Sequence, residues 1–375
     1  MSSFKEGLED VVVSTSEICF IDGREGRLLY RGYDVDDLVQ HASFEEVVYL
    51  LWHGSLPSRK DLDAHVKALS ATATRKLPPK VVAILRQLPK KTTPMEVLRT
   101  GVSALSAFDP DAADNSREAT VRKALRITAQ MPTLVAAWER LRRGKSPLAP
   151  NPKLSLAGNF LYMFTGQKPT ELATKTFDVA LTLHADHEFN ASTFAARVTA
   201  ATLSDLHSAV VSGIGALKGP LHGGANEQVM RMVEQIGTPD RAESWIKKAL
   251  ADKARIMGFG HRVYRVEDPR AKHLRRLATE LGKQTGRTHY VQILNTVARV
   301  VTDDKKIYPN VDLYSGAAYA AMGIPTDQFT PIFAMSRVAG WAAHVLEQHA
   351  HNRLIRPRAE YTGHTRQAYV PIDRR

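Results

Sequence analysis

The sequence predicts a mainly α-helical protein that carries one short β-hairpin near its N-terminus. Most of the chain divides into helix-length segments that begin with a capping residue and end at Gly or Pro, whereas strand-like residues are confined to the N-terminal region. The chain has 375 residues, of which 43% are hydrophobic and 24% charged, so it is long enough to bury a substantial core. No repeat period, heptad run or low-complexity segment is present.

The hairpin is predicted over residues 16–35, SEICFIDGREGRLLYRGYDV. Apolar residues that favour strands lie on both sides of DGREG, whose Asp and Gly residues are typical of turns. Little else in the chain has a strand pattern, so the remainder is expected to be a packed array of helices.

The first helices are predicted from their N-terminal capping residues. Three starts are recognised: Ser43 with Glu46, Ser58 with Asp61, and Thr93 with Pro94 and Glu96. Further helices are predicted over 117–145, 153–166, 170–186, 192–218, 225–236 and 240–256. The apolar stretch 198–219 contains Asp205 and His207, so it is expected to be a buried helix of a soluble protein rather than a membrane span.

The two ends of the chain carry different signals. The first residues, MSSFKEGLED, include acids and lack the apolar stretch of a secretory signal. The single cysteine, Cys19, excludes an internal disulfide and a cysteine-based zinc site, and both observations favour the cytoplasm. Residues 351–375 are polar, basic and interrupted by Pro, so they are expected to form an extended arm.

The formal net charge of +12 suits an anionic partner, whether a nucleic acid, an acidic lipid surface or a small acidic substrate. The cations are scattered along the chain, apart from the segment 140–145 and the C-terminal tail. Charge patterning alone leaves a solvated basic surface and a specific anionic ligand as open alternatives.

Four polar segments that contain a His or Asp interrupt the helical pattern, and three of them also contain Gly or Pro. They are LHADHEFNAS (183–192), GPLHGGANE (219–227), GFGHRVYRVEDPR (258–270) and YPNVDLYSG (308–316). Glycine turns and helix ends expose backbone N–H groups and allow a ligand to approach closely, so titratable side chains there are well placed for chemistry.

Two interpretations of the histidines in the first segment stay open from the residues alone. His184 and His187 are three positions apart, with Asp186 and Glu188 beside them, so both imidazoles could lie on one helical face as metal ligands. Against this, the chain has no HExxH spacing, and of the other segments two offer one His each and the third offers none. The alternative is that both are hydrogen-bonded core histidines.

The remaining segments contain candidates for acid–base chemistry. His222 and His261 are each flanked by glycines, a setting in which an imidazole can donate or accept a proton. Asp312 follows a Pro-Asn turn, where an Asp is more often a helix cap. GxSxG, GxxxxGK[ST] and GxGxxG are absent, so two His, one Asp and many Arg suggest acid–base chemistry on a multiply charged carboxylate.

Taken together and in this order, the four segments resemble those of the citrate synthases, and the match runs from YRGYDV near the N-terminus to RPRAEYTG near the C-terminus. The resemblance implies a mainly α, multi-helical homodimer in which a large and a small domain close on the substrates. The large domain would comprise 1–221 and 321–375, and the small domain 222–320. The resemblance also removes the metal interpretation.

The resemblance further implies a role for each candidate. Asp312 would remove a proton from the methyl group of acetyl-CoA while His222, oriented by Ser192, hydrogen-bonds the thioester oxygen. His261 would protonate the carbonyl oxygen of oxaloacetate as the new carbon–carbon bond forms, and water would then split citryl-CoA. The residues implied to bind oxaloacetate are His187, Arg270, Arg337 and, from the partner subunit, Arg356. Those implied to bind coenzyme A are Arg265, Gly258 and Gly260.

The sequence leaves two alternatives to this function. A 2-methylcitrate synthase would use propionyl-CoA, and one extra methylene changes binding by only about 1–3 kcal/mol, so the motifs do not separate the two. A basic, helical nucleic-acid-binding protein would suit the charge of +12, but no recognisable reading module is present. We expect no cofactor, because acetyl-CoA is a substrate. We also expect no metal, no nucleic acid and no membrane as partners.

Overall fold

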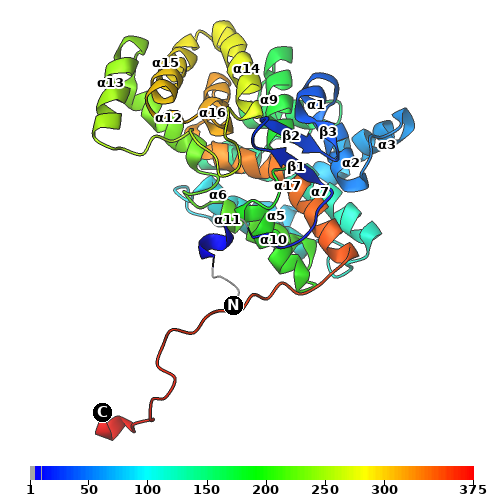
Figure 1. Ribbon diagram of the computed structural model, residues 1–375. Coiled ribbons are helices and arrows are strands. Elements are labelled where there is room, and N and C mark those ends of the chain that lie inside the picture. The colour runs from blue at the N-terminus through cyan, green and yellow to red at the C-terminus, as the bar shows by residue number, and fades with distance from the viewer. Residues whose placement is uncertain (1–4, 10) are drawn as a thin grey trace.

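The structure, a computed structural model, describes residues 5–9 and 11–375 and is built mainly from helices (Figure 1). A small antiparallel sheet lies near the N-terminus, with strands β1 (Cys19–Asp22), β2 (Arg27–Tyr30) and β3 (Tyr33–Asp34) adjacent in chain order. Its register pairs Cys19 with Tyr30 and Asp22 with Arg27, which confirms the predicted hairpin. The two-residue strand β3 was not predicted.

The first eleven α-helices and a short 3₁₀ helix cover the chain up to residue 217. They are η1 (Glu6–Leu8), α1 (Val35–His41), α2 (Phe44–His53), α3 (Arg59–Ser70), α4 (Thr72–Arg75), α5 (Pro79–Gln87), α6 (Pro94–Ser106), α7 (Arg117–Arg142), α8 (Leu156–Thr165), α9 (Glu171–His184), α10 (Ala191–Ala201) and α11 (Leu206–Leu217). The predicted caps are confirmed, because Ser43 accepts a hydrogen bond from the Glu46 N–H, Ser58 does so from Asp61, and Thr93 forms a capping box with Glu96.

The remaining elements form a second group and a long final helix. They are α12 (Ala225–Ile236), α13 (Pro239–Ala251), α14 (Pro269–Thr285), α15 (Thr288–Lys305), α16 (Val311–Ala321), η2 (Thr326–Gln328), α17 (Phe329–Ala350) and η3 (Ile372–Arg374). Helices α12 to α16 pack chiefly against one another, while α14 and α16 also contact α9, and α12 contacts α17. In Figure 1 they lie together above α17.

One helix prediction was wrong. Residues 192–218 form two helices, α10 and α11, rather than one, and the break falls inside the stretch expected to be a single buried helix. Leu203 adopts a positive φ of 64°, and the Asp205 carboxylate caps α11 by accepting a hydrogen bond from the Ser208 N–H at 3.1 Å. The acid that argued against a membrane span therefore starts a new helix. None of the described helices is both long and apolar enough to cross a bilayer.

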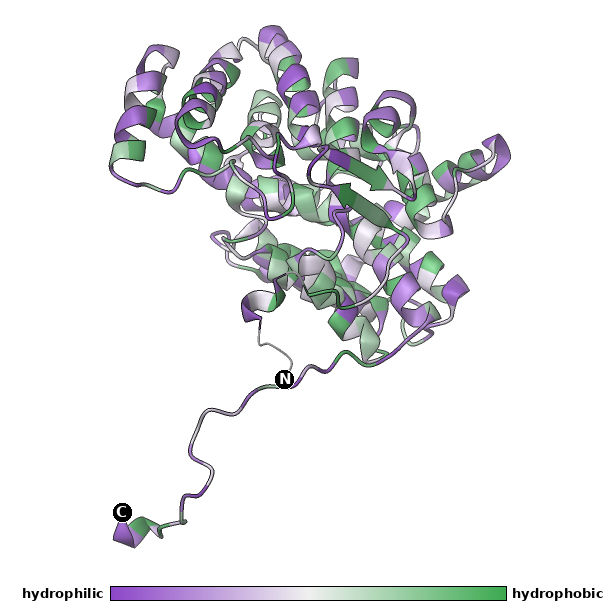
Figure 2. Cartoon of the chain, in the orientation of Figure 1, coloured by the Kyte–Doolittle hydropathy of each residue, from purple (hydrophilic) through white to green (hydrophobic). Residues whose placement is uncertain are grey.

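Helix α17 is the centre of the packing. It is buried along almost its whole length and contacts α2, α7, α9, α10 and α11. Figure 2 shows hydrophobic residues on this helix and on the strands β1 and β2, whereas hydrophilic residues are frequent on the outlying helices α13 and α15. Gly340 lets α17 approach the turn after α9, because a Cβ there would collide with the Ala185 carbonyl oxygen and the Asp186 carboxylate.

The chain after α17 leaves the body of the molecule. Residues 351–375 have no secondary structure except η3 and are almost entirely exposed, which confirms the predicted extended arm (Figure 1). Apolar side chains on the arm, including Leu354 and Tyr361, make it an unusual surface segment, because large apolar groups are seldom left so exposed.

We predict that Gly340→Ala destabilises the fold by about 1–3 kcal/mol, because the added methyl group has no room beside Ala185 and Asp186. Gly215→Ala is the matched control. It also lies in a helix, but nothing lies within 4 Å of the added Cβ, so it should stabilise by roughly 0.5–1 kcal/mol. Urea unfolding measures both effects. Equal stabilities for the two variants would show that this close approach is unnecessary.

Candidate active site

Two histidines that are far apart in the sequence meet between α9 and α14. His187 lies in the turn after α9, His261 lies in the loop before α14, and their ring centroids are 4.9 Å apart. Tyr264 packs against both rings, and its hydroxyl lies 3.3 Å from His187 Nε2. Burial lowers the pKa of His187 well below its usual value, and Arg270 adds to this effect.

Glycines join the His261 loop to the segment that leads into α16. The Gly260 N–H donates to the Tyr308 carbonyl at 2.9 Å, and the Asn310 N–H donates to the Gly258 carbonyl at 2.9 Å. Both glycines have positive φ, 87° and 74° for Gly258 and Gly260, which other residues rarely adopt. These contacts place His261 and Asp312, at the start of α16, on the same side of the molecule.

The backbone fixes which nitrogen of His261 carries the proton. Its Nδ1 accepts hydrogen bonds from the Val263 and Tyr264 N–H groups at 3.0 and 3.2 Å. An N–H group can only donate, so the proton of the neutral ring lies on Nε2. Burial lowers the pKa of His261 to about 4, with Arg270 adding to the effect, so the ring is a neutral donor near pH 7.

His222 carries its proton on the opposite nitrogen. The Ser192 N–H donates to His222 Nε2 at 3.3 Å, and the Ser192 hydroxyl lies 2.8 Å from the same atom. Nε2 is therefore an acceptor and Nδ1 holds the proton. The Ser192 hydroxyl is itself held by Trp341 Nε1 and by Asn190, the cap of α10. Burial lowers the pKa of His222 to about 4.

Asp312 is not the cap of its helix, contrary to what spacing alone favoured. Asn310 caps α16 by accepting from the Asp312 N–H at 3.0 Å, which leaves the Asp312 side chain free. Among the described residues, its buried Oδ1 has no hydrogen-bond partner. Burial raises the pKa of Asp312 to about 7 even though Arg270 and Arg337 favour its ionised form. This carboxylate can take up a proton near neutral pH.

Arg270 is buried and paired with an acid that the sequence reasoning missed. Its Nε and Nη2 donate to the two oxygens of Asp268 at 2.9 and 2.7 Å. Asp268 also caps α14 and accepts from the Val311 N–H at 3.3 Å, so it links the ends of two helices. The Asp-Pro sequence at the start of α14 was the available signal.

Arg337 is buried without such a partner. It lies on α17, is 1% exposed, and its Nε donates to the His184 carbonyl at 2.7 Å. Its guanidinium stacks on the Phe333 ring at 4.8 Å, and within the described chain its Nη1 has no hydrogen-bond partner. Burial lowers the pKa of Arg337, but a guanidinium stays charged at neutral pH. An anion is the natural ligand of a buried cation in this condition.

The two histidines of the first segment do not share a helical face. Helix α9 ends at His184, so His187 lies beyond it in the turn. His184 Nδ1 donates to the Ala180 carbonyl at 2.7 Å, and burial lowers its pKa to about 3. In the part of the chain that the structure describes, no cluster of three or more His, Cys, Asp or Glu has the arrangement of a metal site.

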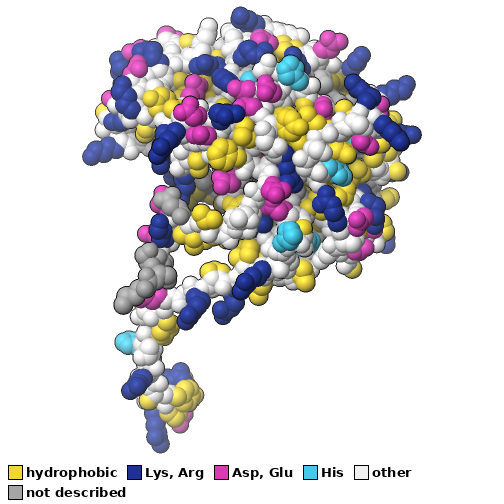
Figure 3. Space-filling model, turned by 45° about the vertical axis from the view of Figure 1, so that its right-hand side comes forward, with side chains coloured by type: hydrophobic (Ala, Val, Ile, Leu, Met, Phe, Trp, Pro, Cys, Tyr) yellow, Lys and Arg dark blue, Asp and Glu magenta, His cyan; other side chains and the backbone are white. Residues whose placement is uncertain are grey.

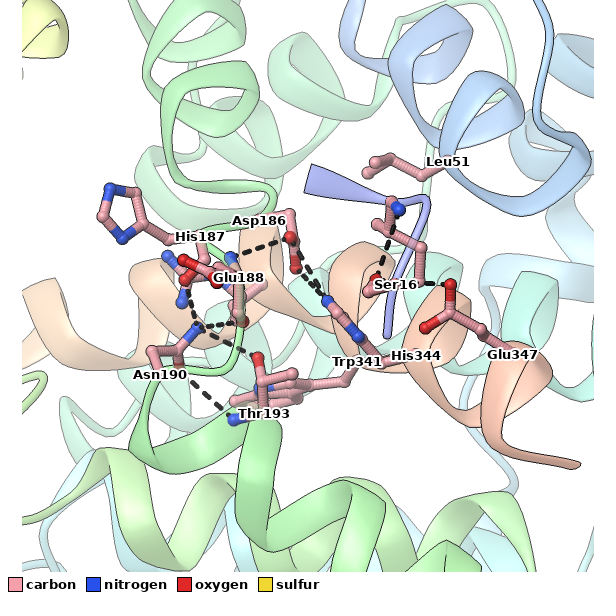
Figure 4. Close-up of polar contacts among 12 residues, drawn as sticks. Ser16, Leu51, Asp186, His187, Glu188, Asn190, Thr193, Trp341, His344 and Glu347 are labelled. Carbon is pink, nitrogen blue, oxygen red and sulfur yellow. Dashed lines mark hydrogen bonds and ion pairs between the residues drawn. The ribbon is translucent and has the colours of Figure 1, made fainter. Parts of the chain in front are cut away.

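A buried polar network braces the turn that carries His187 (Figure 4). Asp186 Oδ1 lies 3.1 Å from His344 Nε2, and both residues are fully buried. Arg197 Nη1 donates to His344 Nδ1 at 3.2 Å and to Glu347 at 2.6 Å. Arg197 therefore directs the His344 proton to Nε2, toward Asp186. No sequence motif pointed to this network.

Two predicted binding residues lie outside this cluster. Arg265 is exposed on the His261 loop, and Arg356 is exposed on the C-terminal arm, six residues after the end of α17 at Ala350. The structure brings together His187, Ser192, His222, His261, Arg270, Asp312 and Arg337, but it brings neither Arg265 nor Arg356 to them within one chain.

Comparison with known proteins gives one consistent result. A family model described as "Citrate synthase, C-terminal domain" matches residues 7–358. The chain is 50% identical to the citrate synthase of Haloferax volcanii, covering 99% of both proteins. It is 44% identical to a 2-methylcitrate synthase of Mycobacterium tuberculosis, covering 96% of this chain and 91% of that protein.

Solved structures agree with the sequence relatives. The citrate synthase of Pyrobaculum aerophilum superposes with a TM-score of 0.92 at 42% identity, covering 98% of this chain and 94% of that one. The citrate synthase of Thermoplasma acidophilum, solved as a ternary complex with carboxymethyl coenzyme A and oxaloacetate, has a TM-score of 0.93 at 35% identity and 99% coverage of both chains. The fold, the order of the site segments and these similarities lead to the same conclusion: this chain belongs to the citrate synthase family.

Proposed function

We propose that this protein is a citrate synthase, which condenses acetyl-CoA with oxaloacetate and water to give citrate and coenzyme A. The observation that carries the proposal is the combination of two neutral histidines and a buried carboxylate. His222 and His261 present donors on Nδ1 and Nε2, and Asp312 has an oxygen without a partner among the described side chains and a pKa raised to about 7. A Thermoplasma acidophilum relative bound to oxaloacetate and a coenzyme A analogue supports the same substrates.

The first step in this proposal is enolisation of acetyl-CoA. Asp312 removes a proton from the methyl group while His222 Nδ1–H donates to the thioester oxygen. A thioester methyl is a very weak acid, so the negative charge that develops on oxygen must be stabilised as the proton leaves. Burial makes Asp312 a stronger base than an exposed Asp, which brings its pKa closer to the operating pH.

The second step is carbon–carbon bond formation. The enol carbon attacks the carbonyl carbon of oxaloacetate, and His261 Nε2–H gives its proton to the carbonyl oxygen. Because two backbone N–H groups hold His261 Nδ1, the ring cannot present the wrong nitrogen without losing both bonds. Water then hydrolyses the thioester of citryl-CoA to give citrate and coenzyme A.

Oxaloacetate carries two carboxylates, and the buried cations fit them. Arg337 Nη1 has no hydrogen-bond partner in the part of the chain that the structure describes, Arg270 is held by Asp268, and His187 lies beside His261. Planar guanidinium groups bind carboxylates through two parallel hydrogen bonds, which a lysine cannot do. Within this proposal Arg356 contributes a further cation from the partner subunit.

The proposed assembly is a homodimer of two-domain subunits. The exposed apolar residues of the C-terminal arm are consistent with an arm that lies on a second copy. The packing of α12 to α16 against one another supports a small domain of 222–320 inserted in a large domain of 1–221 and 321–375. In this arrangement Arg265, Gly258 and Gly260 face coenzyme A, and no metal or cofactor is needed.

A 2-methylcitrate synthase is the second candidate, because a relative with that name is 44% identical over nearly the whole chain. Comparing turnover of acetyl-CoA and propionyl-CoA at fixed oxaloacetate separates the two.

The hypothesis of a nucleic-acid-binding protein has less support. On the face shown in Figure 3, Lys and Arg side chains are scattered among acidic ones rather than gathered in one stripe.

The direct test is release of free thiol from acetyl-CoA. Thiol release should require oxaloacetate and should survive dialysis against a strong chelator. Thiol release without oxaloacetate would contradict the proposed reaction, and activity lost to the chelator and restored by Zn²⁺ would revive the metal site at His184 and His187.

We predict that Asp312→Asn lowers condensation by about 10²–10⁴-fold, the usual effect of losing a general base, because the amide cannot accept the methyl proton. Hydrolysis of supplied citryl-CoA should fall much less, since it needs no proton from carbon. Following coenzyme A release from each substrate separates the steps. Near wild-type condensation by this variant would mean that Asp312 is not the base.

We predict that kcat/KM for acetyl-CoA rises with pH through a pKa near 7. Asp312 must be ionised to accept a proton, and burial raises its pKa to about 7, so activity should fall about tenfold per unit below that pH. His222 and His261, with pKa values lowered to about 4, should add no inflection between pH 6 and 8. A flat profile from pH 5.5 to 8 would contradict this assignment.

We predict that Arg356→Ala weakens oxaloacetate binding by about 1.5–3 kcal/mol, the cost of one hydrogen bond to a charged group, without changing the unfolding temperature. Mixing it with Asp312→Asn under conditions of subunit exchange should regenerate some active sites, since each hybrid dimer holds one site with both wild-type residues. Unchanged oxaloacetate affinity, or no recovery in exchanged mixtures, would remove Arg356 from the site.

A further inference from the structure

The N-terminal hairpin, residues 19–30 of β1, β2 and their turn, contacts both segments that carry the paired histidines. We propose that this hairpin is a bracket that sets the position of His261 relative to His187 when the two domains are closed, with Gly23 and Tyr30 as its two positioning residues. The proposal rests on the proposed function, because it concerns how the oxaloacetate site is held in shape.

At one end of the bracket, Tyr30 holds the turn that carries His187. Tyr30 is fully buried at the end of β2, and its hydroxyl lies 3.1 Å from the carbonyl oxygens of both Thr182 and Asp186. The Asp186 N–H points at the same hydroxyl at 3.4 Å. A single phenol therefore ties the last turn of α9 to the residue that immediately precedes His187.

At the other end, Gly23 touches the loop that carries His261. The Gly23 carbonyl accepts a hydrogen bond from the Arg265 N–H at 2.8 Å. A Cβ on Gly23 would collide with the Val263 carbonyl oxygen and lie 2.8 Å from its carbonyl carbon, so the two backbones are in direct contact. Val263 and Tyr264 are the residues whose N–H groups hold His261 Nδ1. Movement of this backbone would therefore move the His261 ring.

The hairpin between these ends is stiff. Four residue pairs from Cys19–Tyr30 to Asp22–Arg27 form its ladder, and Asp22 Oδ1 accepts from the Arg24 and Glu25 N–H groups at 2.9 Å each. The Asp22 bonds form a tight turn that sets the position of Gly23 relative to the strands. The distance between the Tyr30 and Gly23 contacts is thus set by the strand ladder and by the Asp22 side chain in the turn.

Gly23 itself can be replaced by alanine without backbone strain. The φ of Gly23 is not positive, in contrast to that of Gly26, so alanine adds no backbone strain there. The added methyl group of Gly23→Ala should therefore act by pushing the Val263 backbone away from the hairpin. Glu25→Ala is the matched control, because Glu25 is exposed at the same turn and its bond to Asp22 uses the backbone N–H.

The experiment measures steady-state kinetics and unfolding temperature for the wild type, Gly23→Ala, Tyr30→Phe and Glu25→Ala. A displacement of about 1 Å can cost on the order of a hundredfold in rate, so Gly23→Ala should raise the KM for oxaloacetate or lower kcat by ten- to a hundredfold. The unfolding temperature should fall, as for Gly340→Ala, because the added methyl group meets the Val263 backbone, so the kinetics are measured well below it. The KM for acetyl-CoA should change less than the KM for oxaloacetate. Tyr30→Phe should act in the same direction, and Glu25→Ala should match the wild type.

A spectroscopic readout separates positioning from mere stabilisation. The infrared carbonyl stretch of bound, ¹³C-labelled oxaloacetate reports the hydrogen bond from His261, and in Gly23→Ala it should move toward the value of free oxaloacetate. Wild-type kinetics and carbonyl frequency in Gly23→Ala would overturn the proposal. So would equal losses for both substrates that track a lowered unfolding temperature. Absence of thiol release by the wild type would instead contradict the proposed function itself.

Discussion

The buried guanidinium of Arg337 is the constraint on which the rest of the site depends. Removing a cation from water costs several kcal/mol, and within the described chain the buried Asp186 carboxylate favours the charged form of Arg337 without forming an ion pair or hydrogen bond with it. What holds it is the C-terminal end of α9, where its Nε donates to the His184 carbonyl and the negative end of the helix dipole lies. The close packing of α17 on this helix end, allowed by Gly340, is therefore part of the electrostatics of the site.

The positive charge of Arg337 and Arg270 explains the behaviour of the neighbouring groups. Burial and these cations together disfavour a second positive charge, so the pKa values of His187, His222 and His261 are lowered and the rings are neutral donors. The same cations limit the rise in the pKa of Asp312 that burial causes. An anionic substrate would supply the hydrogen-bond acceptor that Arg337 Nη1 lacks within the described chain.

Local features of the fold could be predicted from sequence because they depend on neighbouring residues. The hairpin turn and the caps Ser43, Ser58 and Thr93 are of this kind. The break at 202–205 was missed because the apolar pattern continues across it, although Asp205 with Ser208 carried a capping signal. The helical extent of the first polar segment was also overestimated, so His184 and His187 were placed on one face.

The site could be predicted only in part for a related reason. Its residue types and flanking glycines suggested acid–base chemistry, but the convergence of four distant segments came from the resemblance to a family. The contacts that hold these segments, Asp268 with Arg270, Asp186 with His344, and Tyr30 with the α9 turn, join positions of different elements. From the sequence, Asp312 could be either a helix cap or a catalytic residue. The structure shows that Asn310 is the cap of α16.

Arg337 Nη1, which has no hydrogen-bond partner in the described chain, is expected to bind a substrate carboxylate beside the donor on His261. The structure of the oxaloacetate complex tests it most directly. The account predicts one carboxylate within about 3 Å of Arg337 Nη1 and the carbonyl oxygen at the same distance from His261 Nε2, the usual hydrogen-bond length. Oxaloacetate bound with Arg337 still unpaired, or with its carbonyl oxygen turned away from His261, would contradict it.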